Sequence, residues 1–167
     1  MNARKRLRGL LARPGIVVAP GAFDALAARI IEQEGFEAVY ATGAGIANSL
    51  LGQPDVGLLS MGEVLRQVCY ITAATELPVI VDIDTGYGNP LNVFRSVREF
   101  ERAGAAALQI EDQVNPKRCG HFEGKAVVSA AEMVQRVRAA ADARRDPDLV
   151  IIARTDARAS EGLEAAL

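Results

Sequence analysis

Cysteine and histidine are scarce in this chain of 167 residues. Its two cysteines, Cys69 and Cys119, show no paired spacing, which argues against a disulfide framework and for a reducing compartment, by default the cytoplasm. The single histidine, His121, lacks the second Cys/His pair that a structural zinc site needs. Cys69 lies in the stretch EVLRQVCYI, where we expect a packed apolar thiol.

An excess of charge of one sign and a long hydrophobic run are also missing. The formal net charge is −2 with acids and bases mixed, so the sequence offers no electrostatic footprint for nucleic acid or for an anionic membrane. No segment approaches the roughly 20 apolar residues of a membrane span. The cationic, acid-free start also satisfies the composition of a transit peptide, but its short, interrupted apolar pattern favours an amphipathic helix over about 3–12.

Half of the residues are hydrophobic, which predicts one globular domain over 1–167. Short β-branched runs alternate with segments of helical period, a pattern typical of parallel α/β folds. The expected strands are 16–20, 38–42, 78–84, 107–111 and 149–154. The expected helices are 24–34, 61–75, 91–103, 130–144 and one that begins near Glu161.

Two folds share this rhythm, an open doubly wound sheet and a closed (β/α)₈ barrel. Polar residues follow every expected strand, as in a barrel whose strand ends share one mouth, and no G-x-G-x-x-G follows the first strand. We therefore favour a TIM-type barrel. Because a complete barrel takes about 250 residues, we expect a truncated barrel of about five βα units, as a fragment of a longer protein or, alternatively, as one of two complementing chains.

The stretch VDIDTGYGN, residues 81–89, places two acids at one strand end. Asp82 and Asp84 are two residues apart and should face the same way, so their repulsion would be relieved by a hard divalent cation such as Mg²⁺. Glu111, at the end of the next strand, could add a third carboxylate. The alternative is that these acids cap helices or pair with Arg154 and Lys117. Glycines at 86 and 88 suggest a tight turn.

The stretch PKRCGH, residues 116–121, places Cys119 among Lys117, Arg118 and His121. Neighbouring positive charge favours a thiolate, which suits a thiol that gives up a proton. The loop over about 113–128 is long, so we interpret it as a lid with hinges at Gly120 and Gly124. The alternative is a basic surface loop with an incidental cysteine.

The stretch YATGAG, residues 40–45, predicts a strand that opens into a turn of small residues. Backbone N–H groups in such a turn could bind a carboxylate, whereas the residues of a phosphate-binding P-loop are missing. Tyr40 is either a core residue or a catalytic one.

These motifs, together with QPD at 53–55, QIEDQ at 109–113 and IARTDA at 152–157, occur in an order that resembles the isocitrate lyase and phosphoenolpyruvate mutase superfamily along essentially the whole chain. The chain is most similar to its 2-methylisocitrate lyase, dimethylmalate lyase and carboxyvinyl-carboxyphosphonate phosphorylmutase group. The resemblance implies a (β/α)₈ barrel, a homo-oligomer (a tetramer at full length), a small carboxylate substrate, and Mg²⁺ as cofactor with Mn²⁺ as a substitute.

The resemblance also implies roles for individual residues. Those that match the metal site are Asp82, Asp84, Glu111 and Asp55. Those that match substrate-binding positions are Thr42, Gly43, Ala44, Gly120 and Arg154. Those that match catalytic positions are Cys119, Tyr40, Lys117 and His121. Methylisocitrate lyases usually have serine and a third glycine where this chain has Thr42 and Ala44, which leaves the substrate open.

The resulting functional prediction is a Mg²⁺-dependent carbon–carbon lyase. It would cleave a 2-hydroxy di- or tricarboxylate to a keto acid such as pyruvate, with Cys119 protonating the other fragment and Tyr40 taking part in removal of the hydroxyl proton. One alternative is phosphonomutase or oxaloacetate decarboxylase chemistry on the same site. Another is an inactive truncated fragment.

Overall fold

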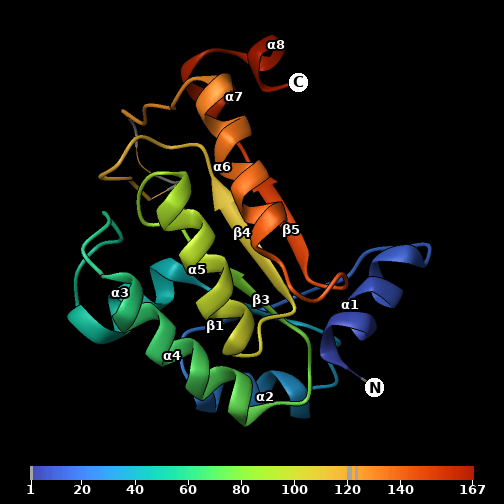
Figure 1. Ribbon diagram of the computed structural model, residues 1–167. Helices are drawn as coiled ribbons and strands as arrows, with labels where there is room; N and C mark the ends of the chain where they lie inside the picture. The colour runs from blue at the N-terminus through green and yellow to red at the C-terminus, as the bar shows by residue number, and fades with distance from the viewer. Residues whose placement is uncertain (1, 120–121, 123) are drawn as a thin grey trace.

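A parallel sheet forms the centre of the computed structural model, which describes residues 2–119, 122 and 124–167 (Figure 1). Over these residues the sheet has five strands, in the spatial order of the chain. They are β1 (Gly21–Ala22), β2 (Val39–Ala41), β3 (Val79–Asp82), β4 (Ala107–Glu111) and β5 (Val150–Arg154). A doubly wound sheet reverses its strand order at a switch point, so this order excludes the open-sheet alternative.

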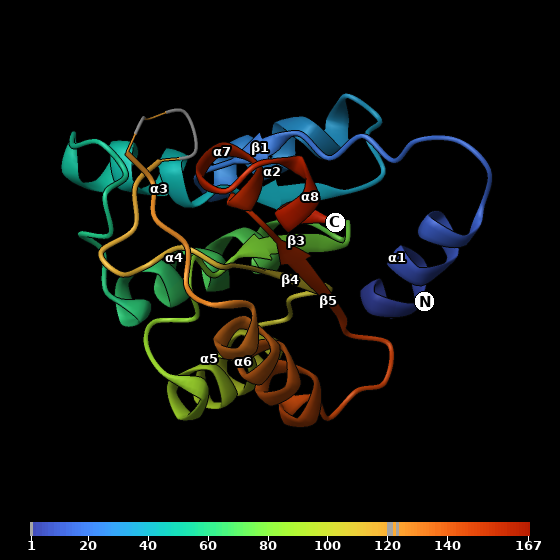
Figure 2. The ribbon, with the colours of Figure 1, turned by 90° about the horizontal axis from the view of Figure 1, so that it is seen from above.

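Helices follow the strands, as the alternating pattern predicted. They are α1 (Ala3–Ala12), α2 (Ala25–Gln33), α3 (Gly43–Leu51), α4 (Met61–Ala74), α5 (Pro90–Arg102), α6 (Ala130–Ala143), α7 (Ala157–Ser160) and α8 (Leu163–Ala166). Helices α4, α5 and α6 lie in front of the strands in Figure 1, and α1 and α3 lie on opposite sides of the molecule in both Figure 1 and Figure 2. In the described part of the chain, no helix is both long enough and apolar enough to cross a membrane.

Side-chain caps explain where the longer helices begin. Ser60 and Glu63 form a reciprocal capping box at the start of α4, and Asn89 caps α5 directly before a proline at its first position. Ser129 caps α6 by accepting from the N–H of Glu132. These polar residues mark the helix boundaries that the apolar period alone could give only approximately.

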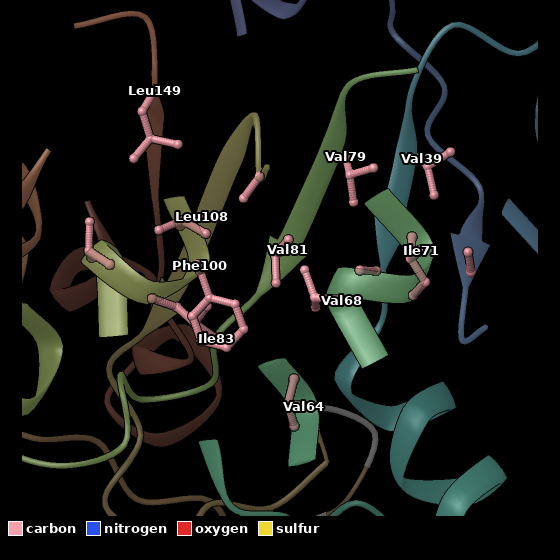
Figure 3. Close-up of a cluster of buried hydrophobic side chains, with 14 of the residues drawn as sticks. Val39, Val64, Val68, Ile71, Val79, Val81, Ile83, Phe100, Leu108 and Leu149 are labelled. Atoms are coloured by element: carbon pink, nitrogen blue, oxygen red, sulfur yellow. The ribbon is translucent and has the colours of Figure 1, made fainter. Parts of the chain in front are cut away.

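The hydrophobic core lies between the outer face of the sheet and the helices. Val79, Val81 and Ile83 point toward Val68 and Phe100 of the covering helices (Figure 3). These side chains are almost completely buried. Since side chains alternate along a strand, the intervening residues face the other side of the sheet, where a barrel has its interior.

Helix α1 covers part of that inner face. Leu7 is fully buried against Ala106 and Ala107, with Ile80, Val150 and Ile152 packed around them. The N-terminal amphipathic helix predicted over 3–12 is therefore present, and its apolar side closes one end of the sheet's interior.

Two local predictions were wrong. Residues 16–20 form no strand, because Ile16 and Val18 are exposed and Pro20 has no N–H to donate to a ladder; pairing begins only at Gly21. Residues 42–45 form no turn: Thr42 caps α3 by accepting from the N–H of Gly45, and the burial of Ile46 and Ala47 stabilises the helix despite its glycines.

The expected burial of Cys69 was also wrong, since its side chain is exposed. The buried residues of α4 are Val64, Val68 and Ile71. Cys69 follows Val68 directly, so it lies about 100° further around the helix, away from this face.

Replacing Leu7 with alanine should lower the free energy of unfolding by about 2–5 kcal/mol, because it leaves a cavity against the sheet. Leu11→Ala is the matched control: Leu11 is 53% exposed in the same helix, so its loss should change stability by about 0.5 kcal/mol or less. Urea unfolding of the two variants measures the difference, and equal losses would show that α1 does not depend on the Leu7 contact.

Candidate active site at the carboxyl ends of the strands

The inner face of the sheet carries the polar residues singled out in the sequence. Asp82 pairs in register with Gln109 of β4, and Glu111 pairs with Arg154 of β5. Because the strands are parallel, their carboxyl ends meet at one edge of the sheet. The predicted convergence of Asp82, Glu111 and Arg154 is therefore present.

Asp82 and Asp84 face the same small volume beside the start of α3. A Cβ atom placed on Gly43 would stand 3.2 Å from one oxygen of Asp82 and 3.4 Å from one oxygen of Asp84. Burial, reinforced by the charge of Asp82, raises the pKa of Asp84 to about 6. Asp84 also has a positive φ of 49°, a conformation that is uncommon outside glycine but that aspartate adopts more readily than most residues.

The turn after these acids requires its glycines, as predicted. Gly86 and Gly88 have φ values of 83° and 143°, and a Cβ at either position would come within 2.5 Å of a neighbouring side chain. The turn brings the chain back to Asn89 at the start of α5.

Lys117 enters this acidic volume from the loop after β4. Its side chain is 4% exposed, and its ammonium group lies 2.7 Å from Asp84 Oδ1 and forms a close ion pair with Asp55. Burial works against the charged form of Lys117, but Asp84 and Asp55 outweigh it and hold its pKa above the ordinary value. The sequence left open that these acids pair with Lys117, and Asp84 does so. Asp55, from the loop before α4, pairs with the same ammonium group.

Glu111 is the most isolated of the acids. Its Oε2 atom lies 3.5 Å from Arg154 Nη1, and within the described residues its buried Oε1 atom has no hydrogen-bond partner. Burial raises the pKa of Glu111 to about 7, against the opposing charge of Arg154. A buried acceptor of this kind requires a ligand, an ion or a proton.

Tyr40 faces the same interior from β2. Gln109 Nε2 donates a hydrogen bond to its hydroxyl at 2.7 Å. Burial, together with the nearby charge of Asp82, raises the pKa of Tyr40 above its ordinary value, which disfavours a phenolate. Tyr40 is thus a site residue and not a core residue.

The acidic residues fit a divalent cation in charge and in ligand type. Four carboxylates (Asp55, Asp82, Asp84 and Glu111) face two cationic side chains (Lys117 and Arg154), so two negative charges remain if all are ionised. Within the part of the chain that the structure describes, no three His, Cys, Asp or Glu side chains lie together as a ready-made metal site. Mg²⁺ needs only one or two carboxylates, with water and substrate as further ligands, and Asp82 and Asp84 could supply these.

The thiol predicted as a proton donor lies at the edge of this site. Cys119, Asp55 and Ala44 line a hollow of about 470 Å³. Gly124 has a φ of 73°, which favours glycine, and a Cβ there would meet the Arg118 guanidinium at 2.9 Å. Its role as a hinge stays a prediction. The predicted site residues Gly120 and His121 lie outside the described residues.

Sequence reasoning missed three polar residues of the site. Gln109 shares a strand face with Glu111, so the period of two already indicated that it points inward. Gln113 and Asp156 follow β4 and β5, and both side chains are almost fully buried and hydrogen-bonded to each other at 2.9 Å. The motifs QIEDQ at 109–113 and IARTDA at 152–157 contain all three residues, but no role was assigned to them from the sequence.

Comparison with known proteins identifies the chain's relatives. The sequence pattern of a family described as phosphoenolpyruvate phosphomutase matches residues 7–167. A 2,3-dimethylmalate lyase from Eubacterium barkeri is 53% identical over all of this chain and 58% of its own length. A 2-methylisocitrate lyase from Shewanella oneidensis is 52% identical over 99% of this chain and 57% of its own length. The chain therefore spans a little over half of the length of these relatives.

Solved structures give the same grouping. An oxaloacetate acetylhydrolase in complex with 3,3-difluorooxalacetate superposes with a TM-score of 0.93 at 42% identity, covering 98% of this chain and 57% of that protein. A phosphonopyruvate hydrolase in complex with oxalate and Mg²⁺ superposes with a TM-score of 0.89 at 34% identity, over 98% of this chain and 56% of that one. The predicted fold class, the first five βα units of a (β/α)₈ barrel, is confirmed.

The raised pKa of Glu111 predicts a pH-dependent stability in protein stripped of divalent ions. Between about pH 4.5 and 7 the folded chain binds a proton at Glu111 that the unfolded chain has released, so stability falls as the pH rises through this window. Glu111→Gln removes the buried charge and should stabilise the protein by about 1–3 kcal/mol at pH 8, but not at pH 4.

Urea unfolding at the two pH values, in the presence of a chelator, measures this difference. Glu76→Gln, at an exposed position, is the matched control and should behave as the parent protein does at both pH values. A Glu111→Gln protein that is no more stable than the parent at pH 8 would contradict the assigned cost of burying this carboxylate.

Proposed function

The chain belongs to the phosphoenolpyruvate phosphomutase family, within the phosphoenolpyruvate mutase and isocitrate lyase superfamily, and on this premise we propose that it carries the site of a Mg²⁺-dependent carbon–carbon lyase. The observation that supports this most directly is the buried acidic group of Asp82, Asp84 and Asp55 beside the Cys119 loop. The substrate would be a 2-hydroxy di- or tricarboxylate, the class to which the substrates named for the two lyase relatives belong.

The proposed reaction is a retro-aldol type cleavage. The substrate hydroxyl loses its proton, the adjacent C–C bond breaks, and the hydroxyl oxygen becomes the carbonyl of a keto acid such as pyruvate. The electron pair of the broken bond stays on the carbon next to a carboxylate of the other fragment, and the Cys119 thiol returns a proton to that carbon. When bound, Mg²⁺ would stabilise the negative charge that develops on oxygen, a contribution of several kcal/mol.

Residues of this chain would orient the substrate. The start of α3, at Thr42, Gly43 and Ala44, would present the N–H groups of Gly43 and Ala44 and the positive end of a helix dipole to the keto-acid carboxylate, whereas the N–H of Thr42 already donates to Ala22. Arg154, at the end of β5, would bind a second carboxylate of the substrate. Tyr40, which accepts a hydrogen bond from Gln109, would contact the reacting hydroxyl as a neutral phenol. Because its pKa is raised, Tyr40 would need the positive charge of the cation to act as a base.

Lys117 would balance charge and close the loop over the site. Its ammonium joins the loop to Asp55 and Asp84, so a closed loop places Cys119, two residues further on, at the edge of the site. Closure would exclude water from the carbanionic fragment. The roles of Gly120 and His121 rest on the resemblance alone, as do homo-oligomer formation, a cytoplasmic location and replacement of Mg²⁺ by Mn²⁺.

The proposal is tested by keto-acid release from 2-methylisocitrate, isocitrate, 2,3-dimethylmalate and oxaloacetate, with and without Mg²⁺. The expected product is pyruvate except from isocitrate, whose cleavage gives glyoxylate. The assay uses both the 167-residue chain and the full coding product that contains it. Mg²⁺-dependent release from a hydroxy acid supports a lyase. Release from oxaloacetate alone would favour a decarboxylase, and absence of turnover in both proteins would favour an inactive product.

Cys119→Ser should lower kcat for the cleaved hydroxy acid by about 10²–10⁴-fold, because serine is a far weaker acid than a thiol at this position. Cys69→Ser, on the exposed face of α4, is the control and should retain the parent rate. Steady-state kinetics at saturating Mg²⁺ measure both. Unchanged turnover in Cys119→Ser would contradict the proton-donor role and favour mutase or decarboxylase chemistry that does not use this thiol.

A further inference from the structure

A buried amide side chain holds the backbone directly before Cys119. Gln113 is 1% exposed and follows β4. Its Nε2 group donates to the carbonyl oxygen of Arg118 at 2.9 Å, and its Oε1 atom accepts from the N–H of the same residue at 2.9 Å. One side chain thus satisfies both the donor and the acceptor of a single residue, which a purely apolar or purely acidic side chain could not do.

Asp156 connects this contact to the other limb of the loop, the residues that follow Cys119. Its Oδ2 atom accepts from Gln113 Nε2 at 2.9 Å, and its Oδ1 atom accepts from Lys125 Nζ at 2.8 Å. Asp156 is itself fixed, because its N–H donates to Asp112 Oδ1 at 2.9 Å. Both limbs of the Cys119 loop therefore meet on one buried carboxylate at the end of β5.

The backbone at the base of the loop adds a short antiparallel pairing. Gln113 forms an isolated bridge with Val127, and the N–H of Val114 donates to the carbonyl of Ala126 at 2.8 Å. This pairing holds the base of the loop closed but does not reach Arg118. The backbone of the residue that precedes the thiol is held by the side chain of Gln113, which Asp156 holds in turn, in addition to the ion pairs of the neighbouring Lys117.

From these contacts we infer that Gln113 and Asp156 are positioning residues that fix the Cys119 segment over the carboxyl ends of the strands. Adjacent Cα atoms are 3.8 Å apart, so holding the Arg118 backbone leaves little freedom for the thiol. The inference rests on the proposed function for its catalytic meaning, since it assumes that Cys119 is the proton donor. The position of the segment can be measured without turnover.

The test compares alkylation of the two cysteines by iodoacetamide in the intact protein, with mass spectrometry reporting the rate at each site. Cys69 is exposed on α4 and serves as the internal reference. Gln113→Met keeps the length and neutrality of the side chain but removes its hydrogen bonds, and should raise the ratio of Cys119 to Cys69 labelling about fivefold or more. Lys125→Met removes the second limb's ion pair with Asp156 and should raise the ratio in the same direction.

Gln135→Met and Lys5→Met are the matched controls, because both residues are exposed on helices away from the loop, and both should label as the parent does. Labelling ratios within twofold of the parent in both loop variants, with their melting temperatures retained, would overturn the inference. Hydrogen exchange of the Arg118 amide in the parent protein decides the matter even if the variants unfold: strong protection supports the contact with Gln113, and exchange at the rate of an open loop contradicts it.

If the lyase activity is confirmed, Gln113→Met should lower kcat at least about tenfold with little change in KM and in Mg²⁺ affinity, since the thiol would be displaced while the substrate and ion sites remain. Equal loss of Mg²⁺ binding would indicate general structural damage and count against a positioning role. Absence of turnover in the parent protein would remove the proposed function but leave the labelling and exchange results to decide the position of the segment.

Discussion

The mutual repulsion of buried carboxylates at the ends of adjacent strands is the constraint on which the site depends. Parallel pairing places Asp82 and Glu111 at one edge of the sheet, and the positive φ of Asp84 turns a further acid into the same volume. Such a group is costly to bury unless it is neutralised, and its raised pKa values express that cost. Lys117 and Arg154 provide part of the compensation, and a divalent cation would provide the remainder.

The same constraint links the proposed metal site to the loop. Lys117 is attracted into the acidic group from the loop, whereas Gln113 and Asp156 hold the loop from the side of the sheet. Cys119 directly follows the two residues at which these attachments act, Lys117 and Arg118. The acidic group thereby also helps to determine where the proposed proton donor lies. The proposed lyase reaction needs this arrangement, with a cation for the first step and a nearby acid for the second.

Most of the fold was predictable from short-range periodicity, which indicated four of the strands and the main helices. The parallel arrangement of the strands made the strand order and the inward-facing acids predictable as well. The register Glu111 to Arg154 follows from that arrangement directly. Residues 16–20 and helix α3 were predicted wrongly, because apolar residues can be exposed at an edge and because burial of Ile46 outweighs the glycines of α3. The contacts of Gln113 with Arg118 could not be predicted, since they depend on the path of a long loop that carries no period.

The most direct test of the central claim is calorimetric titration of Mg²⁺ into protein stripped of divalent ions, beside the variant Asp82→Asn. If the crowded carboxylates form an ion site, the parent protein should bind Mg²⁺ with about one ion per chain, and Asp82→Asn should bind it at least about tenfold more weakly, a loss of about 1.4 kcal/mol or more. Equal affinity in the two proteins, or no binding by the parent, would contradict the claim that these acids hold a cation.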